Sequence, residues 1–207
     1  MPPNPAGVHR LHTPLPAVLG YQAPLYGRRT AQYLLESLQF QDARLFFPSY
    51  HVEDQVRAYA VYGGTPAYLH TIQSRKSLNE NIMDGILTRG SFLYDEVRFV
   101  LQQELREPRN YFAILQAIAA GKTRLNEIKQ ATGIDGATAY LDTLQQLHLV
   151  ERLVPVTETQ PQKSRRGIYR LKDHYLRFWF RYVHPNRSQL ERGGSQTIME
   201  SQVVAEI

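Results

Sequence analysis

The stretch from residue 108 to 173 contains three helical segments followed by two short apolar runs. The helices are predicted at Tyr111–Ala120, Leu125–Thr132 and Ala137–Leu147. Val150–Thr157 is rich in valine and alternates in part, and it is predicted to pair with a second strand at Ile168–Leu171. Three helices and then a two-stranded hairpin are the layout of a winged helix-turn-helix. This order limits the possible folds more than any other feature.

The rest of the chain adds helices, so the predicted fold class is mainly α. Further helices are expected at Asp42–Phe47, Val52–Tyr62, Leu78–Leu87 and Phe92–Leu105. Val52, Val56, Tyr59 and Ala60 fall at helical spacing and predict an amphipathic helix that ends at Gly63-Gly64. Pro66 then opens another helix, and Pro108 closes the helix at Phe92–Leu105.

Both ends of the chain differ from this pattern. Residues 1–16 are rich in proline and are expected to form an extended or disordered arm, and Ala31–Leu35 is a candidate strand. The run YLRFWFRYV at 175–183 predicts a helix buried between two elements. The tail from Asn186 is polar without a clear core face, apart from the closing IMESQVVAEI. The expected divisions are therefore 1–16, 17–107, 108–173 and 174–207.

Composition excludes several classes of protein. The chain has 207 residues and no cysteine, which excludes disulfides and thiolate metal sites. No apolar run approaches the roughly 20 residues that span a bilayer, and no secretory signal precedes the fold, so a cytoplasmic location is expected. The net charge of +5 is concentrated between Lys163 and Arg192, where only Asp173 and Glu191 are acidic. Such a basic run invites an anionic partner.

No complete catalytic site is visible in the sequence. The string GKT at Gly121–Thr123 resembles the end of a P-loop. A P-loop also needs a glycine five residues earlier, but that position is occupied by Gln116, within a predicted helix. Gly121 is therefore interpreted as the end of that helix. The seven histidines show no metal-binding spacing, so no metal site is predicted.

The winged helix raises the question of nucleic acid. Its third helix exposes Thr138, Asp142, Gln145 and Gln146 but no arginine or lysine, which argues against reading of a base sequence. The wing carries the candidates for contact with a phosphate backbone, namely Lys163, Arg165, Arg166 and Arg170. Weak, sequence-independent DNA binding and a plain solvated loop both remain open at this point.

Five sequence blocks together resemble the archaeal-type ATPases, a family also common in bacteria. The blocks are PLYGRRT (24–30), FQDARLFFP (40–48), AYAVYGGTPAYL (58–69), QELREPRNYFAIL (103–115) and GIYRLKDHYLRFWFRYVHPN (167–186). The resemblance implies a P-loop ATPase core, a helical lid, a winged helix and a C-terminal region related to restriction-endonuclease-like nucleases.

The resemblance also implies roles for single residues. Gly64 and Pro66 of the GGTP turn would approach the adenine of a nucleotide, although the turn by itself also suits a plain junction between helices. Arg28 and Arg29 would lie where the ATPase core meets the lid, either on phosphate or at the start of the strand at Ala31–Leu35. Residues 17–107 would then be the remnant of an ATPase core together with the lid.

The sequence departs from the family in two places. It lacks the phosphate loop with its magnesium-holding acid, and it lacks the nuclease-like region with its acidic and lysine residues. We therefore expect the lid and winged-helix regulatory portion of an ATP-binding protein, unable to hydrolyse ATP alone. ATP and magnesium are implied only for a full-length member, and the expected partner is an ATPase core or a full-length homologue. The alternative is a free-standing winged-helix DNA-binding protein, while a nuclease would rest on analogy alone.

Overall fold

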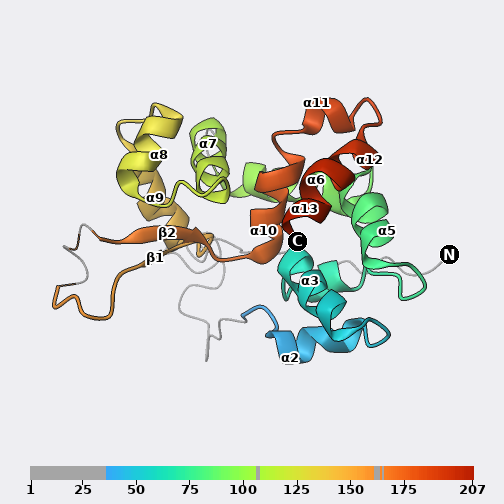
Figure 1. Ribbon diagram of the computed structural model, residues 1–207. Coiled ribbons are helices and arrows are strands. Elements are labelled where there is room, and N and C mark those ends of the chain that lie inside the picture. Colours follow the sequence, from blue (N-terminus) through green and yellow to red (C-terminus); the bar gives the residue numbers. More distant parts are fainter. Residues whose placement is uncertain (1–35, 106–107, 161–163, 165) are drawn as a thin grey trace, which may run out of the picture.

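The computed structural model describes residues 36–105, 108–160, 164 and 166–207, and it is mainly helical with one two-stranded sheet. Figure 1 shows two groups of helices with a central helix between them. The predicted fold class is confirmed, because a bundle of helices precedes a winged helix-turn-helix with a two-stranded wing. The predicted arm and the candidate strand Ala31–Leu35 lie outside the described residues.

Residues 36–105 form the first group, which we call the helical unit. Its elements are α2 (Phe40–Ala43), η1 (Arg44–Phe46), α3 (Val52–Tyr62), α4 (Pro66–Leu69), α5 (Leu78–Ile82), η2 (Met83–Leu87) and α6 (Phe92–Glu104). α5 continues into the π-helical η2, and it begins at a capping box in which Ser77 and Glu80 bond each other's backbone N–H groups. The predicted bounds of α3 and of the continuous helix α5–η2 are confirmed.

A buried amide holds the loop that precedes α5. Asn81 is 4% exposed, and its Nδ2 donates to the hydroxyl of Tyr50 at 2.7 Å and to the carbonyl of Gln73 at 3.0 Å. Its Oδ1 accepts from the N–H of Gln73 at 2.8 Å. Because a buried amide is costly unless it is bonded, this network fixes residues 73–81 in one conformation.

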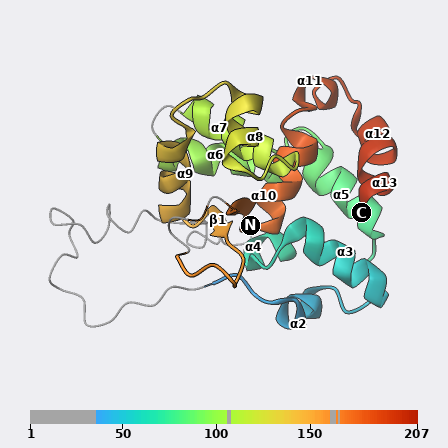
Figure 2. The same cartoon turned by 60° about the vertical axis from the view of Figure 1, so that its left-hand side comes forward.

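The second group is the winged helix. It comprises α7 (Pro108–Ala119), α8 (Leu125–Thr132), α9 (Ala137–Gln146), β1 (Val150–Leu153) and β2 (Ile168–Leu171). The strands are antiparallel, and Val150 faces Leu171 while Leu153 faces Ile168. The N–H of Tyr169 donates to the carbonyl of Thr123 at 2.7 Å, so β2 also bonds the loop between α7 and α8. Figure 2 shows α7, α8 and α9 together on one side of the molecule.

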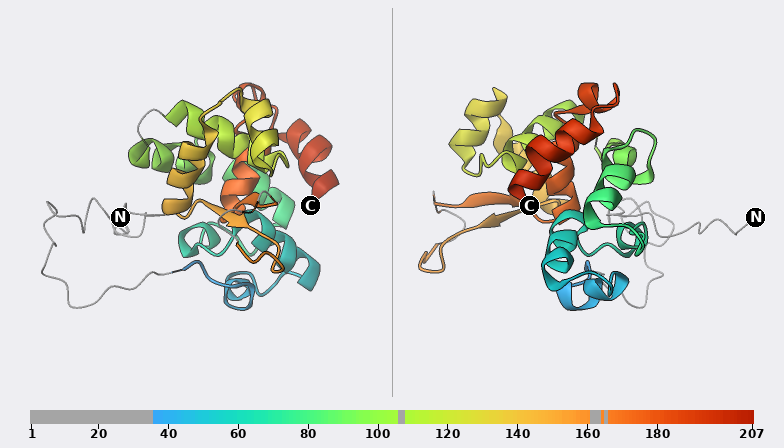
Figure 3. Two further views of the ribbon diagram at one scale, coloured as in Figure 1. Left: turned by 90° about the vertical axis from the view of Figure 1, so that its left-hand side faces the viewer. Right: turned by 45° about the vertical axis from the view of Figure 1, so that its right-hand side comes forward.

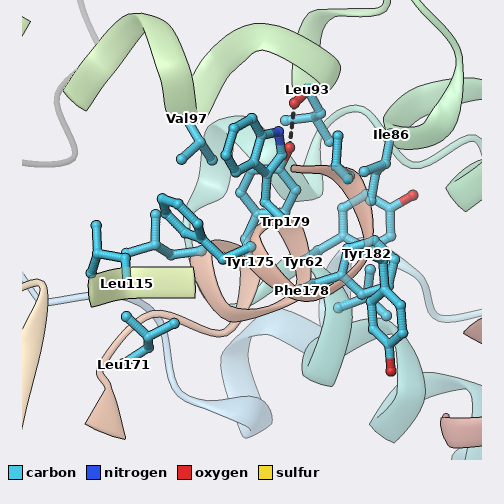
Figure 4. Packing of buried hydrophobic residues seen from close by; sticks show 14 of the residues in the cluster. Tyr62, Ile86, Leu93, Val97, Leu115, Leu171, Tyr175, Phe178, Trp179 and Tyr182 are labelled. Carbon is cyan, nitrogen blue, oxygen red and sulfur yellow. Dashed lines mark hydrogen bonds between the residues drawn. The ribbon is translucent and has the colours of Figure 1, made fainter. Parts of the chain in front are cut away.

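A central helix joins the two groups. It consists of α10 (His174–Phe178) and the π-helical η4 (Trp179–Val183), and it confirms the predicted buried helix at 175–183. α10 packs on α3 of the helical unit, while η4 packs on α7 of the winged helix. Trp179 Nε1 donates to the carbonyl of Tyr94 at 2.8 Å, and the ring of Phe112 meets Phe180 edge-on at 5.4 Å. Figure 4 shows Trp179 among side chains from both groups.

The last elements return to the helical unit. They are α11 (Arg187–Leu190), α12 (Ser195–Ile198), η5 (Met199–Val203) and α13 (Val204–Glu206). α12, η5 and α13 follow one another as a single helix, and α12 packs on η2. The prediction that the tail lacks a core face before its last ten residues is wrong, because Leu190 is 2% exposed. An isolated leucine between polar residues gives no periodic signal.

Three other predictions need correction. β1 ends at Leu153 instead of Thr157, and Pro155, which has no N–H to donate, follows shortly after. Pro108 does more than follow α6, since it begins α7, where a missing N–H costs nothing. The apolar face expected on α3 is buried only in part, since Val52 is 70% and Val56 51% exposed while Tyr59 and Ala60 are half-buried. Tyr59 packs edge-on against His174 of α10, and the fully buried residues of α3 are Ala58, Val61 and Tyr62.

Candidate functional site

The GGTP turn lies at the end of α3. Gly63 has φ +68° and ψ −154°, a conformation that only glycine adopts without strain. The carbonyl of Gly64 accepts from the N–H of Leu38 at 2.9 Å, and a Cβ on Gly64 would lie 1.9 Å from the carbonyl oxygen of Leu38. The close backbone approach expected at Gly64 is therefore made by the chain itself.

Pro66 has a different environment from Gly64. It is the first residue of α4, and it is exposed, whereas Tyr68 and Leu69 of the same helix are buried. Of the two nucleotide-contact candidates in the turn, Pro66 alone presents an accessible surface in this arrangement. Arg28 and Arg29 lie outside the described residues, so their position relative to Pro66 stays a prediction.

The wing carries the candidate nucleic-acid residues. Arg170 is paired across the hairpin with Glu151, with Nη2 2.6 Å from Oε1. Arg166 lies 3.7 Å from a carboxylate oxygen of Glu158, and its side chain is 76% exposed. Lys163 and Arg165 lie outside the described residues. Arg166 and Arg170, the two candidates that the structure describes, are thus partly neutralised by acids of the same hairpin.

α9 presents the surface that would face a major groove. Its exposed side includes Thr138, Asp142 and Gln146, and its buried side includes Leu141 and Leu144. The exposed side carries an acid and no base, as the sequence predicts. Such a surface would repel phosphate, and it has no arginine or lysine that could donate hydrogen bonds to guanine O6 and N7.

The basic run after Lys163 is matched by acids that are distant in sequence. Lys172 lies 3.4 Å from Glu36, Arg181 lies 3.0 Å from Glu206, and Arg187 lies 2.9 Å from Asp95. Counting charges only along the chain therefore overstates the positive field of this region. Arg177, which lines the pocket described below, belongs to the same run and is exposed.

The interpretation of the GKT string as a helix end is confirmed. Gly121 has φ +88°, and its N–H donates to the carbonyl of Ile118 at 2.9 Å. The N–H of Lys122 donates to the carbonyl of Ala117 at 3.0 Å. These two bonds form the Schellman motif that closes α7, so the backbone amides that a phosphate loop would offer are already used.

A pocket that sequence reasoning did not predict lies where the two groups of helices meet. It has a volume of about 490 Å³ and is lined by α3, the end of α7, the central helix and α13. We call it the seam pocket. Three arginines from two helices line it: Arg57, Arg177 and Arg181. The sequence gives no direct signal for this pocket, because only the structure shows that the apolar residue Val56 of α3 is exposed beside the three arginines.

The described ranges contain neither a cluster of metal ligands nor a membrane-spanning helix. No three or more histidine, aspartate or glutamate side chains gather there in a way that would hold a metal ion. No helix in the same ranges has the length and apolar character needed to cross a membrane.

The chain is similar to a known archaeal protein. An uncharacterized protein of Methanocaldococcus jannaschii is 38% identical over 179 residues, which is 85% of this chain and 40% of the relative. No family model matches the chain, and no solved structure matches it. The chain thus spans well under half of the length of its archaeal relative.

Proposed function

We propose that this chain is the lid and winged-helix portion of an archaeal-type ATP-binding protein. In this account it works in the cytoplasm as a regulatory module and does not hydrolyse ATP alone. The helical unit is the lid, and the GGTP turn lies at its nucleotide side with Pro66 accessible. ATP, magnesium and the phosphate loop belong to an ATPase core that the module accompanies.

The observation that carries this proposal is the central helix. One face of α10–η4 completes the core of the helical unit, and another completes the core of the winged helix. A free-standing DNA reader needs only the winged helix, whereas here a single cluster of buried residues runs from Ala43 to Val203. Such an arrangement suits a lid whose movement is passed to the winged helix as one piece.

The comparison with the archaeal relative supports the same proposal. The similarity covers both groups of helices, since 85% of this chain is matched, yet it covers only 40% of the relative. A module that works beside other domains is expected to recur inside longer proteins.

Weak binding of a DNA backbone is the second candidate function. The winged helix and the exposed Arg166 favour it, while the acid on α9 and the pairs Arg170–Glu151 and Arg166–Glu158 oppose it. We therefore expect non-specific contact through the wing and no preference for a base sequence.

A replacement experiment tests the proposed function. Three proteins are compared: the intact Methanocaldococcus jannaschii relative, the same protein without the region that matches this chain, and a chimera that carries this chain in its place. We expect the intact relative and the chimera to bind and hydrolyse ATP, and the deletion to lose regulated hydrolysis. Circular dichroism at the assay temperature verifies that all three are folded.

Two results would contradict the proposal. An intact relative that binds no ATP would remove the ATPase account altogether. A chimera that behaves like the deletion would show that this chain does not supply a lid.

This chain alone should release no phosphate from ATP above background, and Lys122→Ala should leave that background unchanged.

A further inference from the structure

The seam pocket combines an apolar wall with positive charge. Val56 and Ala60 from α3 and Phe178 from α10 supply apolar surface, and Arg57, Arg177 and Arg181 lie around it. Its volume of about 490 Å³ falls within the range of ligand sites. Among the side chains that line it, only that of Glu206 is acidic.

The chain itself shows which chemistry the pocket accepts. Arg181 donates from Nη2 to Glu206 Oε1 at 3.0 Å and Oε2 at 3.1 Å, and the hydroxyl of Tyr182 donates to Oε2 at 2.8 Å. These donors lower the pKa of the Glu206 carboxyl, Arg181 contributing most. Ile207, the next residue, also lines the pocket. A carboxylate followed by an aliphatic side chain therefore occupies one end of it.

The other arginines of the pocket are less engaged. Arg57 forms a pair with Asp54 at 3.4 Å on the same helix, and both side chains are at least 40% exposed, so the pair is weak. Arg177 is exposed on the turn before Arg181. The apolar stripe of α3 also continues beyond the pocket to Val52, which is 70% exposed. Space, charge and apolar surface thus extend past the part that Glu206 and Ile207 fill.

We propose that the seam pocket binds an acidic peptide segment of a partner protein. One carboxylate of the segment replaces Glu206 on Arg181 and Tyr182, and an aliphatic side chain packs on the wall formed by α3 and Phe178. Arg57 and Arg177 attract further acids of the segment. The chain's own Glu206 competes with the partner, so α13 acts as a latch on the site. Figures 1 and 3 show α13 beside α3 and α10, where such competition takes place.

The apolar wall favours a peptide over a nucleic acid or a free phosphate. A phosphate site gains nothing from exposed valines, whereas a peptide buries them while its carboxylate pairs with arginine. Tyr182 fits the same account, because its ring packs on Phe178 while its hydroxyl, at the outer end of the ring in Figure 4, donates to Glu206. Burial and the contact with Glu206 raise the pKa of Tyr182 to about 12, so it stays a donor at neutral pH.

The test uses the whole chain, labelled with ¹⁵N, and follows binding by NMR. The probe is an acetylated and amidated peptide with the sequence of residues 199–207, MESQVVAEI. Glu206→Gln weakens the latch but leaves the pocket intact, so we expect roughly threefold to tenfold tighter binding of the probe than by the unmodified chain. Arg181→Ala also opens the latch, but it removes the main donor, so binding should fall below that of the unmodified chain.

Opposite effects of these two variants separate a binding site from a structural contact. If Glu206 only stabilises the fold, both variants change binding in the same direction or not at all, and the proposal fails. Arg192→Ala, an exposed arginine outside the pocket, should change nothing. A probe with glutamine in place of its last glutamate should bind at least threefold more weakly.

Tripolyphosphate that binds as well as the peptide would assign the pocket to phosphate. A dimer of Glu206→Gln at equilibrium would assign it to a second copy of the chain.

Discussion

At the scale of single residues, Gly64 is the position where the chain leaves least room. Gly64→Ala would drive a Cβ into the carbonyl of Leu38, whose backbone cannot shift without breaking its bond to Gly64. We expect a loss of about 2–4 kcal/mol in the free energy of unfolding, measured by urea denaturation.

Gly85→Ala is the matched control for this change. Gly85 lies within the helical segment η2, and its Cβ would meet only the hydroxyl of Tyr62 at 4.0 Å. Alanine should be neutral there or stabilise the protein by up to about 1 kcal/mol. Equal effects of the two substitutions would contradict the packing of Leu38 on the GGTP turn.

Asn81 provides a second test at this scale. Asn81→Leu removes the bonds that this buried amide forms with Tyr50 and Gln73, including the acceptor of the Gln73 N–H, so we expect a cost of about 2–4 kcal/mol in urea denaturation. Asn79→Leu on the exposed side of the same helix should cost less than about 0.5 kcal/mol. A small effect at Asn81 would mean that the loop before α5 does not depend on this amide.

Single residues also mark where sequence reasoning reaches its limit. Gly64 was recognisable as a place of close approach, but only the fold identifies Leu38 as the group that approaches it. The role of Gly121 could be predicted, because a helix end leaves a local pattern. The partners of Arg181 and Arg187 could not, since Glu206 and Asp95 lie 25 and 92 residues away in the chain.

At the scale of elements, the wing is the place to test DNA binding. Each phosphate contact contributes about −0.9 to the slope of log affinity against log salt, so replacing Arg165 and Arg166 together with alanine should flatten that slope by up to about two units. Fluorescence anisotropy with a random duplex measures this. Adding Arg170→Ala should change the slope little, because Arg170 is paired with Glu151. Binding that is unaffected by the double change, or that prefers one base sequence, would contradict this account of the wing.

The contact between α13 and the central helix should depend on pH. The pKa of Glu206 is lowered by Arg181 and Tyr182, so the stabilisation is fully present above the ordinary glutamate pKa of 4.5 and is lost as pH falls through the lowered value. The pKa of Tyr182 is raised to about 12, so the contact also weakens as pH rises from about 10 toward that value.

Hydrogen exchange of residues 203–206 at a series of pH values measures this dependence. Protection should be constant across the neutral range and should fall on the acid side. Glu206→Gln should abolish the fall in protection at acid pH, whereas Glu200→Gln, on an exposed residue of the same helix, should retain it. If protection still falls at acid pH in Glu206→Gln, another residue is responsible for the titration.

Most elements could be predicted from periodicity and helix-end residues, as α3 and α8 illustrate with their predicted bounds. The buried face of α3 could not, because Val52 and Val56 satisfy helical spacing but are exposed, while Ala58 and Tyr62 are buried. Choosing between two partly apolar faces requires the position of α10. The seam pocket escaped prediction for the same reason, since its lining comes from four separate segments.

At the scale of the whole molecule, Trp179 connects the two groups of helices. Trp179→Phe removes the bond to the carbonyl of Tyr94 and leaves a space where the larger indole ring lay, so we expect a loss of about 1–3 kcal/mol. Because both groups share the central helix, probes in each should report the same lowered urea midpoint. Phe99→Ala, at a 60% exposed position on α6, should change the free energy of unfolding by less than about 0.5 kcal/mol. A midpoint lowered in only one group would contradict the shared core.

We expect the helical unit and the winged helix to behave as one body, because they share the central helix. Native-state hydrogen exchange of the chain in increasing urea tests it most directly, with α3 and α6 compared with α7 and α9. We predict that the slowest amides of all four helices exchange with the same free energy of opening and the same dependence on urea. Opening of α3 and α6 at low urea, while α7 and α9 stay protected, would show that the winged helix is independent and would favour the DNA-binding alternative.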